Sequence, residues 1–134
     1  MIIEKIKKIF FNIKNNLNNE MKDYDLTAAQ IVILKYLYEN IGKVVILKDL
    51  CEYLSLKHST VISILKRLEA KELVNKKTGY TSEISITKKG IELINFIGIK
   101  NGFVEKKLLK GFSKEEIDNL SNYLDRLNDN INNL

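Results

Sequence analysis

Hydrophobic residues recur at three- and four-residue intervals along most of the chain, which is the spacing of amphipathic helices. Before the second of these segments, Thr27 and Gln30 have the spacing of a capping box, in which each side chain binds a backbone N–H of the other residue. Ser55 and Leu56 form a tight connection between the third and fourth segments. The pattern predicts helices over about 2–20, 28–40, 47–54 and 57–71.

After the fourth helix the hydrophobic period falls from about 3.6 residues to two. Ile84 and Ile86 alternate with polar neighbours, which predicts a short strand over 83–87. A similar segment over 73–77 precedes it, and residues 78–82 join the two. The sequence therefore predicts a β-hairpin directly after the fourth helix.

The remainder of the chain returns to a helical period. One long helix is expected up to about residue 109, with a bend at Gly98 and Gly102, because each glycine weakens a helix by about 1 kcal/mol relative to alanine. Ser113 and Glu116 then form a second capping box. The last helix carries a heptad-like apolar stripe formed by Ile117, Leu120, Leu124, Leu127 and Ile131.

The polar face of the fourth helix has a composition suited to DNA. A short helix, a tight turn and a second helix followed by a hairpin match a winged helix-turn-helix. Small hydroxyl side chains allow a helix to lie close in the major groove, and cations further along reach phosphate or guanine. The same face can also be read as an ordinary solvated surface. The predicted DNA-binding residues are Lys57, His58, Ser59, Thr60, Ser63, Lys66 and Arg67 on the helix, and Lys76 and Lys77 on the hairpin.

Charge is concentrated in this part of the chain. Eight basic and three acidic residues lie between Lys57 and Lys89, which equals the net charge of +5 of the whole chain. The last helix, from Ser113, carries two basic and five acidic residues. A localised basic region is expected of a DNA-binding face, whereas terminal helices without a basic stripe are not typical of helices that lie on membranes.

Three motifs carry a family resemblance. The segment 54–74, with its hydroxyl pair, Lys-Arg-Leu-Glu run and closing Leu-Val, resembles the recognition helix of MarR-type regulators, including the SarA/MarR-like proteins. Residues 26–30 (LTAAQ) resemble the opening of the family's second helix, and 86–90 (ITKKG) resemble the end of its wing. The resemblance implies a mainly α fold with a β-hairpin wing. It also implies one domain over 1–134, with a winged helix-turn-helix at 27–89 and dimerisation helices at 1–24 and 90–134.

The chain departs from the family pattern in two places. Family wings often carry Asp-Arg-Arg where this chain has Thr78, Gly79 and Tyr80. Arginine reads the narrow minor groove of AT-rich DNA, so a wing without arginine predicts less selective, more phosphate-driven binding. Lys57 stands where a serine N-cap is common, which adds a charge that can bind phosphate but removes a cap.

The apolar faces of the terminal helices predict a dimer, as the resemblance implies. A two-fold dimer places two recognition helices one DNA turn apart, on an inverted repeat. An internal helical core is the alternative explanation of these faces. The predicted interface residues are Ile6, Phe10, Ile13, Ile117, Leu120, Leu124, Leu127 and Ile131.

The resemblance also implies a small-molecule effector, bound where the dimerisation helices meet the winged domain. Tyr24, Tyr36 and Tyr38 fall in this region, although tyrosines in such places are also common core residues. Cys51 invites comparison with thiol sensors. Its place on the apolar stripe of the third helix favours a buried, inert thiol instead.

Composition narrows the function classes. One cysteine and one histidine cannot assemble a typical zinc site, and no nucleotide-binding or hydrolase motif is present, so neither an enzyme nor a cofactor or metal is expected. No membrane span or secretory signal is expected, which predicts a cytoplasmic protein. The leading hypothesis is a DNA-binding repressor, and the alternative is a winged-helix interaction scaffold that does not bind DNA.

Overall fold

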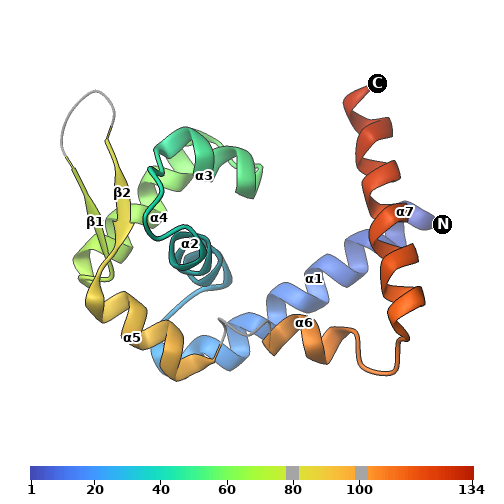
Figure 1. Cartoon of the computed structure of the whole chain (residues 1–134), viewed down its shortest axis with the longest axis horizontal. Helices are drawn as coiled ribbons and strands as arrows, with labels where there is room; N and C mark the ends of the chain where they lie inside the picture. Colours follow the sequence, from blue (N-terminus) through green and yellow to red (C-terminus); the bar gives the residue numbers. More distant parts are fainter. Residues whose placement is uncertain (78–81, 99–102) are drawn as a thin grey trace. The chain divides into compact units, whose positions relative to one another are not determined.

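The computed structural model describes residues 1–77, 82–98 and 103–134 (Figure 1). It is mainly helical, with one antiparallel hairpin of two strands. The predicted fold class is confirmed. In chain order the elements are α1 (Ile2–Met21), η1 (Lys22–Tyr24), α2 (Ala28–Glu39), α3 (Leu47–Leu54), α4 (His58–Ala70), β1 (Val74–Lys76), β2 (Ile84–Ile86), α5 (Lys88–Ile97), α6 (Phe103–Leu108) and α7 (Lys114–Asn132).

The chain divides into two compact units, residues 1–101 and 102–134. The first contains α1 to α5 and the hairpin, and the second contains α6 and α7. The organisation of residues 1–134 as a single domain stays a prediction.

The core of the first unit is built around α2. This helix packs against α1, α4, α5 and β2, while α3 packs against α4, and α4 packs against β1. Because α2 touches neighbours on several sides, its apolar residues are not confined to one stripe. The most deeply buried side chains are Ile33, Leu34, Leu50, Val61, Leu65, Leu68 and Ile94.

The connection between α3 and α4 is the tight turn of a helix-turn-helix. Ser55 adopts a left-handed conformation with φ of 54°, which ends α3 and turns the chain away from the helix. The Leu56 N–H then donates to the Cys51 carbonyl at 3.1 Å. At the start of α3, the Asp49 carboxylate accepts the Ile46 N–H at 2.9 Å, so both ends of this short helix are held.

The predicted hairpin forms, and its strands are antiparallel. Val74 pairs with Ile86 and Lys76 with Ile84, and the Ile84 N–H also donates to the Val45 carbonyl at 2.8 Å. The bond between Ile84 and Val45 holds the hairpin against the loop between α2 and α3. The predicted hairpin loop lies mostly outside the described residues, and so do Thr78, Gly79 and Tyr80.

The junction between β2 and α5 depends on Gly90. A Cβ atom at this position would lie 2.5 Å from the Leu73 carbonyl oxygen and 2.7 Å from Cγ1 of Ile86, which leaves no room for any other residue. Thr87 caps α5 by accepting the Gly90 N–H at 3.0 Å, and its hydroxyl donates to the Glu72 carbonyl at 2.7 Å. The hairpin is thereby fixed against the end of α4.

The prediction of one long helix up to about residue 109 is wrong. Helix α5 ends at Ile97, because Gly98 adopts φ of +79°, a left-handed conformation, and its N–H donates to the Ile94 carbonyl at 3.0 Å. A separate helix, α6, begins at Phe103. The glycine that was expected to bend the helix terminates it, and Gly102 lies outside the described residues.

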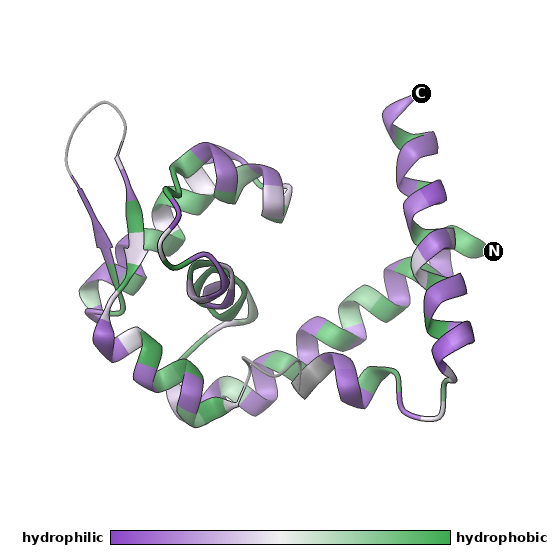
Figure 2. Cartoon of the chain, in the orientation of Figure 1, coloured by the Kyte–Doolittle hydropathy of each residue, from purple (hydrophilic) through white to green (hydrophobic). Residues whose placement is uncertain are grey.

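Helices α1 and α7 each keep an apolar stripe at the surface. Phe10 on α1 is 62% exposed, and Leu124 on α7 is 50% exposed. Figure 2 shows hydrophobic and hydrophilic residues interspersed along α7. Within the described residues, no helix is both long and apolar enough to cross a membrane.

Candidate nucleic-acid interface

Helix α4 has one face in the core and the opposite face in solvent. Val61, Leu65 and Leu68 are buried beneath it, against α2, α3 and β1. The period of the helix then turns the hydroxyl and cationic side chains outward. The exposed candidates on this face, including the residue before the helix, are Lys57, His58, Ser59, Thr60, Ser63, Lys66 and Arg67.

The cations of this face are not neutralised. Lys57, Lys66 and Arg67 have no carboxylate partner within 4.0 Å among the described residues. Lys57 stands at the N-cap of α4 and makes no side-chain hydrogen bond to the helix. The first N–H groups of α4 therefore have no side-chain acceptor, and they add a partial positive charge beside these cations.

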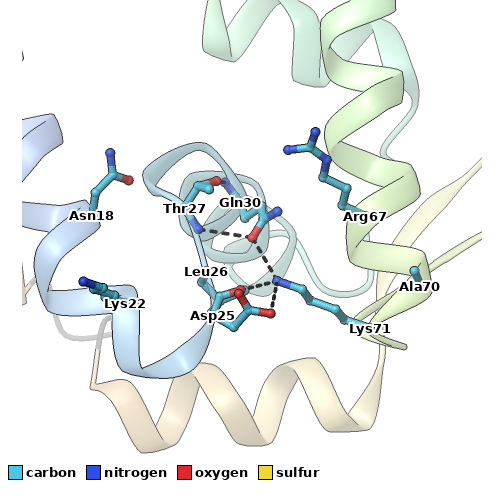
Figure 3. A pocket seen from close by; sticks show the side chains of 9 residues that line it. All are labelled: Asn18, Lys22, Asp25, Leu26, Thr27, Gln30, Arg67, Ala70 and Lys71. Carbon is cyan, nitrogen blue, oxygen red and sulfur yellow. Dashed lines mark hydrogen bonds and ion pairs between the residues drawn. The ribbon is translucent and has the colours of Figure 1, made fainter.

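Arg67 occupies a flank of α4 rather than the centre of its outer face. It lines an open pocket of about 540 Å³ together with Lys71 and Gln30 (Figure 3). At 100° per residue, Ser63 lies almost opposite the buried stripe, with Lys66 and Arg67 on either side of it, and of these three only Arg67 lines the pocket. The structure therefore divides the predicted helix residues between the outer face and this flank.

The two hairpin lysines differ in their surroundings. Lys77 is exposed and its ammonium lies 3.3 Å from the Glu83 carboxylate across the hairpin. Lys76 is half-buried at the end of β1. Only a weak, solvent-screened ion pair holds Lys77, so its ammonium can exchange Glu83 for a phosphate at small cost.

The three predicted effector-pocket tyrosines face different neighbours. Tyr24 packs edge-on against Phe96 of α5, with ring centroids 6.1 Å apart. The Tyr38 hydroxyl donates to Oδ1 of Asn95, also on α5, at 3.2 Å. Tyr36 instead lies 4.6 Å from the Tyr53 ring of α3. None of the three lines the 540 Å³ pocket, and their role in binding an effector stays a prediction.

Cys51 lies in the core, with its side chain 7% exposed. Burial raises the pKa of its thiol above the usual range, and the nearby Glu52 carboxylate raises this pKa further. Both effects disfavour the reactive thiolate. In the part of the chain that the structure describes, no three His, Cys, Asp or Glu side chains are grouped to hold a metal ion.

Comparison with known proteins shows a similarity to one family of regulators. Residues 24–79, from the end of η1 through β1, match the model of the MarR family. Over this segment the chain is similar to proteins of the MarR family. Over 118 residues it is 29% identical to the uncharacterised HTH-type transcriptional regulator YybA of Bacillus subtilis strain 168, which covers 85% of this chain and 77% of YybA.

Solved MarR-family structures are similar to this chain in fold. A putative MarR-family regulator from Listeria monocytogenes, solved with a 26mer DNA, is 27% identical and superposes with a TM-score of 0.86 over 98% of this chain and 89% of its own. The regulator MarR from Oenococcus oeni PSU-1 is 28% identical, with a TM-score of 0.82 over 96% and 99% of the two chains. The resemblance inferred from the motifs is confirmed.

Two MarR-like elements of the site carry residues that the sequence analysis did not single out for binding. Lys71 lies one helical turn after Arg67, and Gln30 was assigned only to a capping box. The four-residue spacing of Arg67 and Lys71 is a signal that both cations share one side of α4. Nothing in the spacing indicates that Gln30 of α2 meets them there.

Proposed function

We propose that this protein is a transcriptional regulator, rather than an enzyme, and that it binds double-stranded DNA as a homodimer. The observation that carries the proposal is the exposed outer face of α4, which combines small hydroxyl groups with cations that have no carboxylate partner among the described residues. The Listeria relative solved with DNA supports the same function for this fold.

In the proposed complex, α4 lies in the major groove. Ser59, Thr60 and Ser63 are small enough to bring the helix close to the base edges, and Lys66 reaches phosphate or guanine. Lys57 and the open start of α4 bind backbone phosphate. The hairpin follows the backbone or the minor groove through Lys76 and Lys77, so affinity depends strongly on salt.

The dimer is proposed from the apolar stripes of α1 and α7. Within the second unit, α7 leaves Leu120, Leu124 and Leu127 partly exposed, and an exposed stripe of this length is stabilised when a second copy covers it. A two-fold dimer places its recognition helices about 34–36 Å apart, which selects an inverted repeat. Repression follows where that repeat overlaps a promoter.

A selection from random double-stranded oligonucleotides, followed by fluorescence anisotropy with the selected DNA, tests this proposal. We expect an inverted repeat and an affinity that falls steeply with salt. Lys66→Glu should weaken binding at least about tenfold, because it replaces an attraction to DNA by a repulsion. Lys8→Glu is the matched control, because it makes the same charge change at an exposed position of α1.

Enrichment of no sequence, or equal loss of affinity in both variants, would contradict specific recognition by α4. A protein that dimerises normally but binds no DNA would instead be an interaction scaffold. The two outcomes separate because sedimentation reports the dimer in the absence of DNA.

A further inference from the structure

The 540 Å³ pocket beside α4 has polar walls drawn from four elements. Asn18 comes from α1, Lys22 from η1, Gln30 from α2, and Arg67 and Lys71 from α4 and its C-terminal end (Figure 3). Its volume falls in the range of small-molecule sites, which is about 300–1,000 Å³. All of these residues belong to the first unit of the chain.

The two amide side chains of the pocket are oriented by the start of α2. The Asn18 Oδ1 accepts the Ala28 N–H at 2.6 Å, and the Gln30 Oε1 accepts the Thr27 N–H at 3.1 Å. These bonds occupy two backbone N–H groups at the start of α2, so the N-terminus of this helix offers little to a ligand. They also occupy the oxygen of each amide, so only its NH₂ group is available to donate a hydrogen bond.

The leftover donors have no acceptor in the protein. Neither amide nitrogen has a hydrogen-bond partner among the described residues, although Gln30 is only 4% exposed. In Figure 3 the Gln30 amide nitrogen lies on the side of Arg67. Among the described residues, no buried side-chain nitrogen or oxygen lacks a partner, so the Gln30 nitrogen reaches the surface of the pocket, where it can donate to water or to a ligand.

The charged side chains that line the pocket are mainly positive. Lys22, Arg67 and Lys71 line it against one carboxylate, that of Asp25, which lies 3.5 Å from the Lys71 ammonium. The side chains of Lys22 and Arg67 have no ionic or hydrogen-bonding partner among the described residues. Every free polar side-chain group except Asp25 is a donor, and the pocket carries two uncompensated positive charges.

From this arrangement we infer that the pocket binds a phosphate monoester of a small organic molecule. A phosphate monoester carries about −1.5 to −2 charges at pH 7 and three strong acceptor oxygens, which match the surplus charge and the free donors. Arginine presents a planar fork that binds phosphate in a bidentate manner. A carboxylate supplies half the charge and fewer acceptors, and the remaining volume accommodates the organic group.

A consequence of the site rests on the proposed function. Arg67 lies on a flank of the helix that we place in the major groove, so a phosphate bound in the pocket competes with DNA for its guanidinium. Occupancy of the pocket should therefore weaken DNA binding beyond the effect of ionic strength.

Titration of the full-length protein with inorganic phosphate, in the absence of DNA, tests the site. Calorimetry and amide NMR shifts are compared with potassium chloride at equal ionic strength. We expect saturable binding with shifts centred on Thr27 and Gln30. Arg67→Gln and Lys22→Gln should each raise the phosphate Kd at least about tenfold, because each removes a charge-assisted hydrogen bond. Lys8→Gln, at an exposed position of α1, should change it less than about twofold.

Absence of saturable binding, or an equal loss in Lys8→Gln, would overturn the inference. If Arg67→Gln weakens DNA binding while the free protein binds no phosphate, Arg67 contacts the DNA backbone, and the inference of a small-molecule site is wrong. If the protein binds phosphate but does not bind DNA, the phosphate site is supported and only the proposed DNA-binding function is contradicted. Phosphate binding that leaves DNA affinity unchanged at constant ionic strength would overturn the competition for Arg67.

Discussion

Helices α4 and α7 are both amphipathic, but only α4 has its apolar side covered within its own unit. Val61, Leu65 and Leu68 of α4 are at most 1% exposed, whereas Leu124 and Ile131 of α7 are 50% and 63% exposed. Their polar sides also differ, because that of α4 is cationic and that of α7 is mainly acidic. One helix is held by this chain and can present its outer face to DNA. The other leaves its apolar side exposed, and we propose that a second copy covers it.

The difference shows that the same hydrophobic period serves two purposes. Periodicity in the sequence indicates that a helix buries one side, but the identity of the covering surface depends on neighbouring elements. Substitutions on each helix test whether its apolar side is covered within its own unit or between copies.

The largest effect is expected in the core beneath α4. Leu65→Ala should reduce the free energy of unfolding by about 2–5 kcal/mol, because it leaves a cavity at a position that is 1% exposed. Chemical denaturation measures the loss. Ser63→Ala, on the exposed side of the same helix, is the control and should change stability by less than about 0.5 kcal/mol. Equal losses in both variants would contradict the burial pattern of α4.

On α7, Leu124→Glu should disrupt assembly instead of folding. A glutamate in the proposed interface is desolvated without a partner, so the dimer Kd should rise at least about 100-fold. Sedimentation at micromolar concentration measures this change. Asn122→Glu lies on the opposite side of α7 at 100° per residue and should leave the dimer intact. An unchanged dimer in Leu124→Glu would remove this stripe from the interface.

The N-termini of the two helices differ in capping, and a substitution there should have a smaller effect on both stability and DNA binding. Ser113 caps α7 by accepting the Glu116 N–H at 3.1 Å, whereas Lys57 has similar backbone angles at the start of α4 but offers no acceptor. Lys57→Ser should stabilise the protein by about 1 kcal/mol. It should also make the slope of log K against log salt less negative by about 0.9, because one phosphate contact is lost.

Lys57→Ala separates these two consequences, since it removes the charge without adding a cap. It should show the same change in salt slope without the gain in stability. A salt slope equal to that of the unmodified protein in both variants would remove Lys57 from the DNA interface.

The smallest effect concerns Cys51, in α3 beneath α4. Because burial raises the pKa of this thiol, the folded protein holds the thiol proton more tightly than the unfolded chain does. Stability from this group is therefore present below the unfolded thiol pKa of about 8.5 and is lost as the pH rises through the folded value. Cys51→Ala should show a shallower loss of stability with pH in the alkaline range. Identical pH slopes would show that the thiol pKa does not change on folding.

Local patterns were sufficient for most of the fold. The helices at 47–54 and 57–71, the hairpin and both capping boxes depend on residues within a few positions of one another. Thr27 and Gln30, for example, exchange two hydrogen bonds that their spacing alone predicts. The DNA-binding side of α4 could be proposed for the same reason, because a helix of known start and period has a known polar face.

The break after α5 could not be read in the same way. The low helix propensity of Gly98 indicates a weak point, but it does not distinguish a bend from an end. The structure shows a left-handed residue whose N–H closes the last turn of the helix, and this ends α5. Propensity measures a cost, whereas the backbone angle that a glycine adopts depends on the path of the chain around it.

The order of residues along the chain is enough to locate most of the helices, to identify their polar sides, and to indicate which family the chain resembles. Folding brings the Gln30 amide and the Arg67 and Lys71 cations to one pocket. Folding also buries the apolar stripe of α4, while residues of the α7 stripe stay exposed. The physical reason is the range of the interactions. Helix formation and capping act over a few residues, whereas a pocket and a covered surface require segments that are far apart in the chain.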